Sequence, residues 1–287
     1  MKPAPFVHHA PATVAEAVAV LGEVGHEGKV LAGGQSLIPI LNMRLASPAH
    51  LVDINRVAGL SSVDVAPGWV RVGATVRHAG LERSEEAYAA LPLLRRALVH
   101  VAHPAIRNRG TTVGSIAHAD AAGEMPAVLC LTGGVVEVVG PAGAREVDAA
   151  DFFAGPLETT LAEDELVVAV RFGRFPDGTR TGFAESARRS GDYALAGVGL
   201  AVAVVDGQVT AARASFVSVT DVPDVLDLTD ALAGPVASVD EAALVDTVRA
   251  HVAPEADIHA TADYRRMLAA ELARRLLSSL LTADGVS

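Results

Sequence analysis

The sequence has 287 residues, of which 51% are apolar and 20% charged, so it is long and apolar enough for two globular domains. Its net charge of −11 argues against a general nucleic-acid surface, because phosphate binding needs clustered lysine and arginine. Cys130 is the only cysteine, which excludes an intrachain disulfide, a four-cysteine zinc site and a cysteine-held iron–sulfur cluster. With no apolar run long enough for a bilayer and no signal-peptide pattern at the start, we expect a cytoplasmic protein without a membrane span.

The first half of the chain predicts mixed helices and strands. Thr13 and Glu16 form a capping-box pattern, which favours a helix to about Val24. Patterns of apolar residues and breakers predict strands at 29–32, 51–54, 69–73, 135–139 and 165–172, and a helix at 91–102. The cluster of turn-forming residues at 173–178 is the best candidate for a domain boundary, giving domains 1–176 and 177–287.

The second half predicts an antiparallel sheet followed by helices. Two long apolar strands, 194–205 and 208–219, are joined by Asp206-Gly207, the strongest short hairpin signal. Helices are expected at 239–252 and 262–281. In the second, an apolar face is expected from Tyr264, Leu268, Leu272 and Leu276, opposite four arginines at 265, 266, 274 and 275. The fold class is therefore α+β in both halves.

Two segments have the composition of phosphate-binding loops. In the first, a predicted strand runs into Gly33-Gly34, and in the second Gly110 and Gly114 alternate with threonine and serine hydroxyls. Asp120 and Glu124 follow one helical turn apart, a spacing suited to ribose hydroxyls. Neither segment is a GxGxxG or GK[ST] motif, and each taken alone is more typical of an ordinary turn.

No group of residues indicates a nucleophile with its base, or a metal site. His8-His9 and the pair His100 and His103 lack a third ligand in the sequence. Cys130 lies among apolar residues and is expected to be a small buried side chain. We therefore assign no catalytic and no metal-binding residue, and expect a cofactor to supply any chemistry.

Three motifs in order are much more specific than either loop. They are LAGGQSLIPILNMRLASPAHLVDIN (31–55), IRNRGTTVGSIAHADAAGEMPAVL (106–129) and RRSGDYALAGVGLAV (188–202). Together they resemble the FAD-binding medium subunit of the molybdenum hydroxylases, the carbon monoxide dehydrogenase and xanthine dehydrogenase group. The resemblance extends to the C-terminal region, where DIHATADYRRMLAAELARRLL (257–277) is similar to that family's last helix.

The resemblance implies a two-part FAD-binding domain of the vanillyl-alcohol-oxidase (PCMH) type, followed by a small domain of antiparallel sheet and helices. It implies FAD as the cofactor, with the first two motifs around the pyrophosphate and the third near the flavin ring. The FAD-binding residues that it implies are Ala32, Gly33, Gly34, Gln35, Ser36, Thr111, Thr112, Val113, Gly114, Ser115, Asp120, Glu124, Val167 and Tyr193.

Four positions depart from the family pattern. Val113 stands where a glycine is usual, Glu124 where aspartate is usual, Glu185 where lysine is common, and Val167 where leucine is common.

The resemblance implies an electron-transfer subunit with two partners, a molybdenum-cofactor large subunit and a [2Fe–2S] small subunit. Electrons would pass from the [2Fe–2S] subunit to FAD and on to NAD, a quinone or another acceptor. The single cysteine agrees with this, because the chain cannot hold the iron–sulfur cluster itself. Two alternatives stay open, namely a stand-alone FAD-dependent oxidase or dehydrogenase, and a structural subunit without flavin.

Overall fold

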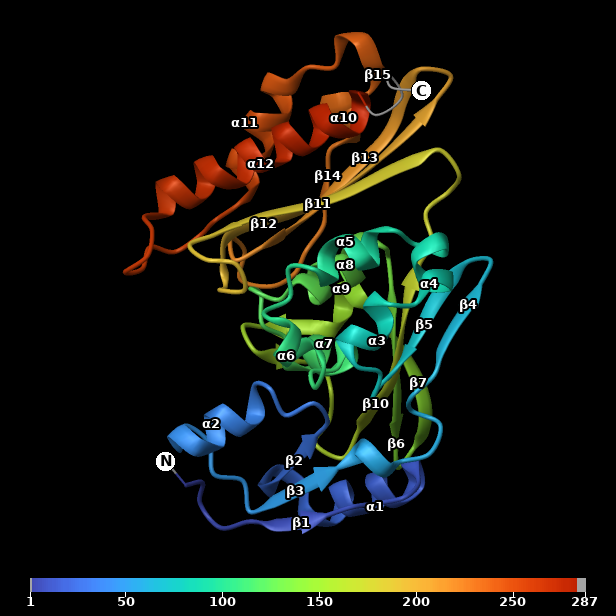
Figure 1. Ribbon diagram of the computed structural model, residues 1–287, viewed down its shortest axis with the longest axis vertical. Coiled ribbons are helices and arrows are strands. Elements are labelled where there is room, and N and C mark those ends of the chain that lie inside the picture. The colour runs from blue at the N-terminus through green and yellow to red at the C-terminus, as the bar shows by residue number, and fades with distance from the viewer. Residues whose placement is uncertain (1, 283–287) are drawn as a thin grey trace.

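The computed structural model describes residues 2–282. Its first sheet is small and parallel, with strand order β1-β3-β2 (Figure 1). It is built from β1 (Val7–His9), β2 (Gly28–Leu31) and β3 (His50–Asp53), together with helices α1 (Val14–Val24) and α2 (Leu37–Met43). As predicted, α1 begins at the Thr13 cap, whose hydroxyl accepts the Glu16 N–H at 3.2 Å, and it ends at Gly25, which has φ 53°. Short 3₁₀ turns follow α1 and β3, at Gly25–Glu27 and Ile54–Arg56.

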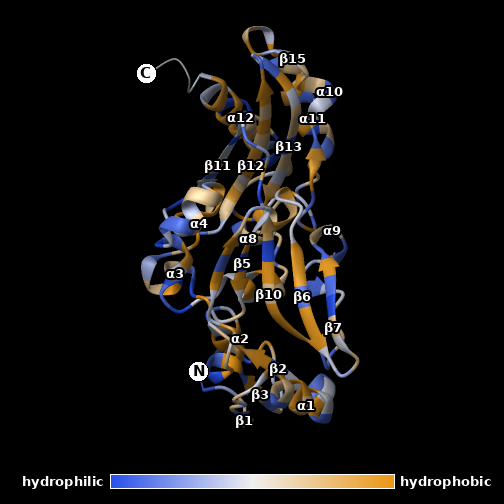
Figure 2. Cartoon of the chain, turned by 90° about the vertical axis from the view of Figure 1, so that its right-hand side faces the viewer, coloured by the Kyte–Doolittle hydropathy of each residue, from blue (hydrophilic) through white to orange (hydrophobic). Residues whose placement is uncertain are grey.

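The second sheet is antiparallel and lies in the middle of the molecule, with order β4-β5-β10-β6-β7. Its strands are β4 (Val63–Ala66), β5 (Trp69–Gly73), β6 (Val135–Gly140), β7 (Gly143–Asp148) and β10 (Leu166–Gly173). In Figure 2, β6 and β10 are predominantly hydrophobic, in agreement with their buried valines. A two-stranded hairpin, β8 (Phe153–Gly155) with β9 (Glu158–Thr159), lies beside it.

Short helices connect β5 to β6 and carry most of the segment that the motif at 106–129 covers. They are α3 (His78–Glu82), α4 (Glu85–Ala90), α5 (Leu93–Leu98), α6 (Pro104–Arg107), α7 (Thr112–His118) and α8 (Glu124–Leu131), with α9 (Ala149–Phe152) after β7. The predicted helix 91–102 is wrong in length, because only Leu93–Leu98 is helical. The chain leaves the helix through turns and reaches Ala102 with φ 43°, a conformation that no helix contains.

The third sheet spans the top of Figure 1, with order β11-β12-β13-β14 and β15 paired to β13. Its elements are β11 (Thr179–Ala187), β12 (Ala194–Val205), β13 (Gln208–Val217), β14 (Leu226–Asp227) and β15 (Gly234–Pro235), with α10 (Thr229–Leu232), α11 (Glu241–His251), α12 (Ala262–Thr282) and a 3₁₀ turn at Val236–Ser238. The predicted hairpin at Asp206-Gly207 is confirmed, with φ of 50° and 72° at its two turn residues.

The third sheet is buried on both faces, which explains the uninterrupted apolar run of β12. Val198, Leu200 and Val202 point into a core with α11 and α12. The opposite face packs against α5 and α8, where Gly199 lets Leu131 approach the strand closely. The fold is α+β, as predicted.

The predicted apolar face of α12 is wrong in part. Tyr264 is 46% exposed, whereas Arg265 is only 7% exposed. The buried residues are Ala269, Ala270, Ala273 and Leu277, flanked by the half-buried Leu268, Leu272 and Leu276. Arg265 is buried because its guanidinium donates to Asp257 at 2.7 Å and to the carbonyl of Leu195 at 2.7 Å. The ion pair and the hydrogen bond to a backbone carbonyl therefore allow Arg265 to be buried, although the spacing of apolar residues alone predicted it on the surface.

Candidate functional site

The first glycine loop follows directly from β2 and turns sharply before α2. Gly34 has φ +71°, which a side chain would strain. Gln35 donates its side-chain amide to the carbonyl of Gly33 at 2.9 Å, which closes the turn. Within residues 2–282, no acceptor takes up the backbone N–H groups of Gly34, Gln35 or Ser36. Consecutive unpaired N–H groups in such a turn form a concave site for an anion.

The second loop, 109–115, runs into α7. The Thr111 hydroxyl accepts the Gly114 N–H at 3.1 Å and so caps the helix. The hydroxyl of Thr112 lies 3.2 Å from Nδ1 of His78, which is buried, and burial lowers the pKa of His78 to about 4. The Thr112 side chain therefore faces the interior, while Ser115 is half-buried and within reach of solvent.

The tertiary structure brings the two loops into contact at Gly33. A Cβ added there would lie 2.7 Å from the carbonyl oxygen of Arg109 and 2.7 Å from Cα of Gly110. The added atom would also be 2.9 Å from the N atom of Thr111. Such distances are shorter than van der Waals contact, so only glycine permits this approach. Two segments 78 residues apart thus form one continuous backbone surface.

Sequence reasoning missed the residues that join these loops. Asn55 donates its side-chain N–H to the carbonyl of Ala32 at 2.9 Å, and Arg77 donates to Oδ1 of Asn55 at 2.6 Å and to the carbonyl of Arg109. The signal available for Asn55 was its position just beyond a buried parallel strand, where polar side chains of α/β proteins often meet. No local pattern marked Arg77.

A second group of predicted residues lies past the C-terminal end of α7. Tyr193 is 69% exposed as a whole residue, but its hydroxyl is hydrogen-bonded to Asp120, and partial desolvation there together with the Asp120 charge raises the Tyr193 pKa. Glu124, at the start of α8, is largely desolvated, which together with the nearby Glu185 and Asp120 carboxylates raises its pKa to about 7. Together with Tyr193, the three carboxylates form what we call the acidic group. Its members come from the start of α8, the segment before α8, β11 and the loop before β12, and they are Glu124, Asp120, Glu185 and Tyr193.

Glu185 links this acidic group to the first domain. Its Oε1 lies 3.4 Å from Nδ1 of His100, and this hydrogen bond raises the pKa of His100 although burial opposes it. The side chain of Glu185 is only 7% exposed, and its Oε2 has no partner among the described residues. A buried carboxylate oxygen without a donor is costly and suits a ligand that offers an N–H or O–H group.

Two further predicted residues are part of the apolar core. Val113 and Val167 are 2% and 5% exposed, and both belong to the core formed by the first domain's sheets and helices. The remaining predicted residues, Ala32 to Ser36 and Gly114, are half-buried or exposed around the loops.

Other candidates in the chain have structural roles. Cys130 is buried, and burial raises the pKa of its thiol to about 12, as expected for a packing residue. Nε2 of His9 lies 3.0 Å from Nδ1 of His50, and His8 pairs with Asp53. Within residues 2–282, no three His, Cys, Asp or Glu side chains are grouped so as to hold a metal ion. No helix in that range is both long and apolar enough to cross a membrane.

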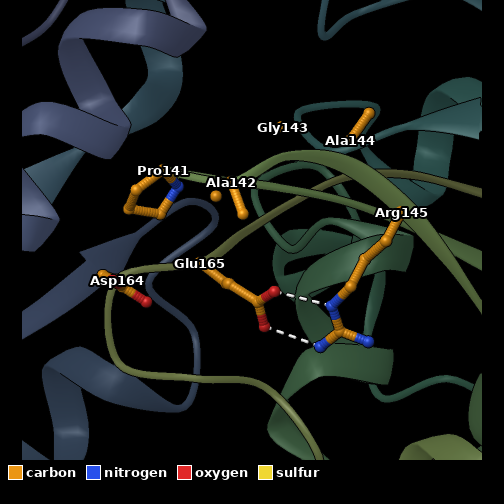
Figure 3. A pocket seen from close by; sticks show the side chains of 8 residues that line it. Pro141, Ala142, Gly143, Ala144, Arg145, Asp164 and Glu165 are labelled. Carbon is orange, nitrogen blue, oxygen red and sulfur yellow. Dashed lines mark hydrogen bonds and ion pairs between the residues drawn. The ribbon is translucent and has the colours of Figure 1, made fainter.

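A hollow of about 240 Å³ lies at the β6–β7 turn (Figure 3). Arg145 and Glu165 line it and form a salt bridge with a shortest N–O distance of 2.6 Å. Its lining includes none of the predicted site residues. The candidate site is therefore the surface that the two loops and the acidic group form.

This fold and site define a two-domain α+β protein with a backbone cradle for a phosphate-bearing cofactor. The family model described as the FAD binding domain in molybdopterin dehydrogenase matches residues 4–174. The model described as the CO dehydrogenase flavoprotein C-terminal domain matches residues 181–280. The chain therefore belongs to the FAD-binding medium subunits of the molybdenum hydroxylase family, and FAD is its cofactor.

Individual relatives are similar over nearly their whole length. The chain is 39% identical to the nicotine 6-hydroxylase medium subunit of Paenarthrobacter nicotinovorans, covering 95% of this chain and 96% of the relative. A solved carbon monoxide dehydrogenase from Hydrogenophaga pseudoflava matches with TM-score 0.91 and 35% identity, over 98% of both chains. Quinoline 2-oxidoreductase from Pseudomonas putida 86 matches with TM-score 0.90 and 34% identity, over 98% of this chain and 99% of the other.

The residues present fit FAD. The unpaired N–H groups of the first loop and the exposed Ser36 hydroxyl would be donors for a pyrophosphate, and Gly33 keeps the second loop close enough that it would share the same group. Arg77 and Arg109 add positive charge beside the loops, and the burial of Arg77, together with the nearby Arg109 charge, lowers the Arg77 pKa. A bound anion would relieve that like-charge repulsion. Asp120 and Glu124 provide acceptors for hydroxyl groups.

Proposed function

We propose that this chain is the electron-transfer subunit of a molybdenum hydroxylase complex. Its partners would be a molybdenum-cofactor subunit that oxidises the substrate and a [2Fe–2S] subunit that passes electrons to this chain. The contact of the two loops at Gly33 carries the proposal, because it brings together two backbone segments that would form one cofactor cradle. FAD, when bound, would supply the redox chemistry, and the chain's residues would bind and orient it.

The names of the relatives support a substrate site outside this chain. Relatives between 34% and 39% identical are named for nicotine and quinoline, which are two-ring nitrogen heterocycles, and for carbon monoxide, which is a diatomic gas. Because chains so alike serve such different molecules, we infer that recognition lies on another subunit. The acceptor, whether NAD, a quinone or another carrier, and a cytoplasmic location are predictions from the sequence.

A division near Pro176 into a FAD-binding domain and a C-terminal domain is part of the same proposal. The last strand of the second sheet ends at Gly173, and β11 begins at Thr179. One family model ends at residue 174 and the other begins at residue 181, on either side of Pro176. The apolar cores are also largely separate, although Phe183, Ala194, Ala201 and Val217 pack with the first.

Purification from the native host tests the proposed function. We expect molybdenum, iron and FAD to co-purify with this chain in one complex. In the absence of oxygen, a molecule that the molybdenum subunit oxidises is expected to bleach the flavin absorbance at about 450 nm in the complex. The isolated FAD-loaded chain should not respond. A chain that purifies alone and whose flavin is bleached by such a probe would support a stand-alone dehydrogenase instead.

Asp120 and Glu124 are expected to contribute unequally to FAD binding. Asp120 lies nearer the glycine turn and is the stronger acceptor at neutral pH, because Glu124 has its pKa raised to about 7 and is partly protonated there. We expect Asp120→Ala to weaken FAD binding by roughly ten-fold, about 1.5 kcal/mol, and Glu124→Ala by less. FAD titration of both apo-proteins at pH 7 measures this, and a larger loss for Glu124→Ala would reverse the assignment.

Tyr193 is expected to shield the flavin without holding it. Its 69% exposure argues against a tyrosine packed at the domain junction, and its hydrogen bond to Asp120 holds the ring beside the acidic group. The ring therefore lies where a bound cofactor would cover it. We expect Tyr193→Ala to keep its FAD content but to change the rate at which oxygen reoxidises the reduced protein, measured by stopped-flow absorbance. A change in thermal stability alone would show that Tyr193 only packs.

A further inference from the structure

We propose that Asn55 and Arg77 form a clasp that sets the spacing of the two glycine loops, and that they are positioning residues for the cofactor. This inference rests on the proposed cofactor cradle and deepens it. The clasp connects the end of β3 in the parallel sheet to the segment that follows β5 of the antiparallel sheet. These parts of the chain share no strand pairing, so side chains must fix their separation.

Asn55 is held rigidly on the side of the first loop. The carboxylate of Asp53 accepts both its backbone N–H, at 2.9 Å, and its side-chain N–H, at 2.6 Å. The same amide nitrogen donates to the carbonyl of Ala32 at 2.9 Å, one residue before Gly33. The amide group of Asn55 is thus oriented by its own strand end, with Oδ1 turned toward Arg77.

Arg77 is held equally well on the side of the second loop. It forms an antiparallel bridge with Thr111, flanked by the bonds from His78 N–H to the Gly110 carbonyl at 3.0 Å and from Thr112 N–H to the Val76 carbonyl at 3.3 Å. Its guanidinium donates one N–H to the Arg109 carbonyl and another, at 2.6 Å, to Oδ1 of Asn55. The planar fork of arginine reaches both acceptors at once, which lysine cannot do.

The clasp acts at the point where the loops touch. Ala32 and Arg109 are the two clasped carbonyls, and they belong to the residues next to Gly33 and Gly110, whose backbones are in contact. A small shift of either carbonyl would therefore change the distance between the unpaired N–H groups of the first loop and the backbone of the second loop. Binding of a rigid anion across two loops is sensitive to such shifts.

FAD affinity of the apo-protein tests the clasp. We expect Asn55→Ala and Arg77→Ala each to weaken FAD binding by about ten-fold. The double variant should bind FAD no more weakly than the single variant that has the lower affinity, because both changes open the same clasp. Arg77→Lys keeps the charge and should not restore affinity. Asn55→Gln, which keeps the amide group but displaces it by one methylene, is the milder variant if Asn55→Ala fails to fold.

Arg174→Ala is the matched control, because Arg174 also joins loops by donating to three backbone carbonyls, those of Ala66, Pro67 and Ala90, but lies outside the cradle. Hydrogen exchange of the His78 and Thr112 amides in the apo-protein gives a second readout. Exchange should accelerate in the Asn55 and Arg77 variants and stay unchanged in Arg174→Ala.

The clasp is wrong if the Asn55 and Arg77 variants keep the FAD affinity and the amide exchange rates of the wild type. It is also wrong if the losses of FAD affinity add up in the double variant, because Arg77 and Asn55 would then act separately. If the wild-type chain binds no FAD, the proposed function fails, and the exchange rates alone then decide whether the clasp exists.

Discussion

Gly33→Val is expected to lose FAD. The first atom of the new side chain would lie 2.7 Å from the Arg109 carbonyl oxygen and from Cα of Gly110, and both obstacles are backbone atoms that cannot rotate away. Overpacking of this kind costs about 1–3 kcal/mol, and separating the loops removes their shared contacts to the pyrophosphate as well. We expect FAD affinity to fall by about 100-fold, as measured by titration of the apo-protein.

Gly34→Val should have a related effect for a different reason. Gly34 has φ +71°, a region that costs a side chain roughly 1–2 kcal/mol, and its Cβ would lie 3.1 Å from Ile38. Gly22→Ala controls for the loss of a glycine, because Gly22 lies in α1 with free space around it and should become slightly more stable. A folded Gly33→Val or Gly34→Val protein that retains full FAD would contradict the cradle assignment.

Stability is expected to fall as pH rises from about 4.5 to 7, because of Glu124. Burial, with the neighbouring Glu185 and Asp120 carboxylates, raises its pKa to about 7, against 4.5 for an unperturbed glutamate. Between these pH values the unfolded chain has released the Glu124 proton and the folded chain still holds it, so unfolding becomes easier as pH rises. The loss is complete above pH 7 and amounts to about 3 kcal/mol at most.

Glu124→Gln isolates this contribution. Glutamine keeps the shape but cannot ionise, so the variant should gain stability over the wild type with rising pH, from little at pH 4.5 to about 3 kcal/mol at pH 8. Urea unfolding of the apo-proteins at both pH values measures the difference. Glu86→Gln, on the exposed surface of α4, controls for the loss of one negative charge. If Glu124→Gln raises the free energy of unfolding equally at both pH values, ionisation of Glu124 does not destabilise the folded protein.

Local chemistry predicted those elements whose boundaries depend on neighbouring residues alone. The Thr13 cap and Gly25 bracket α1, and Asp206-Gly207 joins β12 to β13, because capping bonds and positive φ are decided within a few residues. The helix at 91–102 was predicted too long for the opposite reason. Its last residues have helical composition, but the chain must turn after Leu98 to deliver the second loop to the first.

The sequence predicted which segments form the site, but it did not predict how they are arranged in space. Glycine and hydroxyl residues marked both loops, and the three ordered motifs identified the family and FAD. Nothing local showed that Gly33 touches Gly110 or that Thr112 turns its hydroxyl to His78, because these contacts join residues far apart in the chain. Asn55 and Arg77 were missed for the same reason, since their role exists only between two parts of the fold.

By itself, the sequence determined the α+β class, the hairpin of the second domain, the family and the cofactor, because each depends on local pattern or on ordered motifs. Only the tertiary structure decided which residues share an environment. It buried Arg265 beside Asp257 and left Tyr193 exposed next to Asp120. It also desolvated Glu124 and placed Glu185 near it, so that the pKa of Glu124 rises to about 7. The physical reason is that burial, charge proximity and the spacing of loops depend on long-range packing, which the order of residues along one strand or helix does not specify.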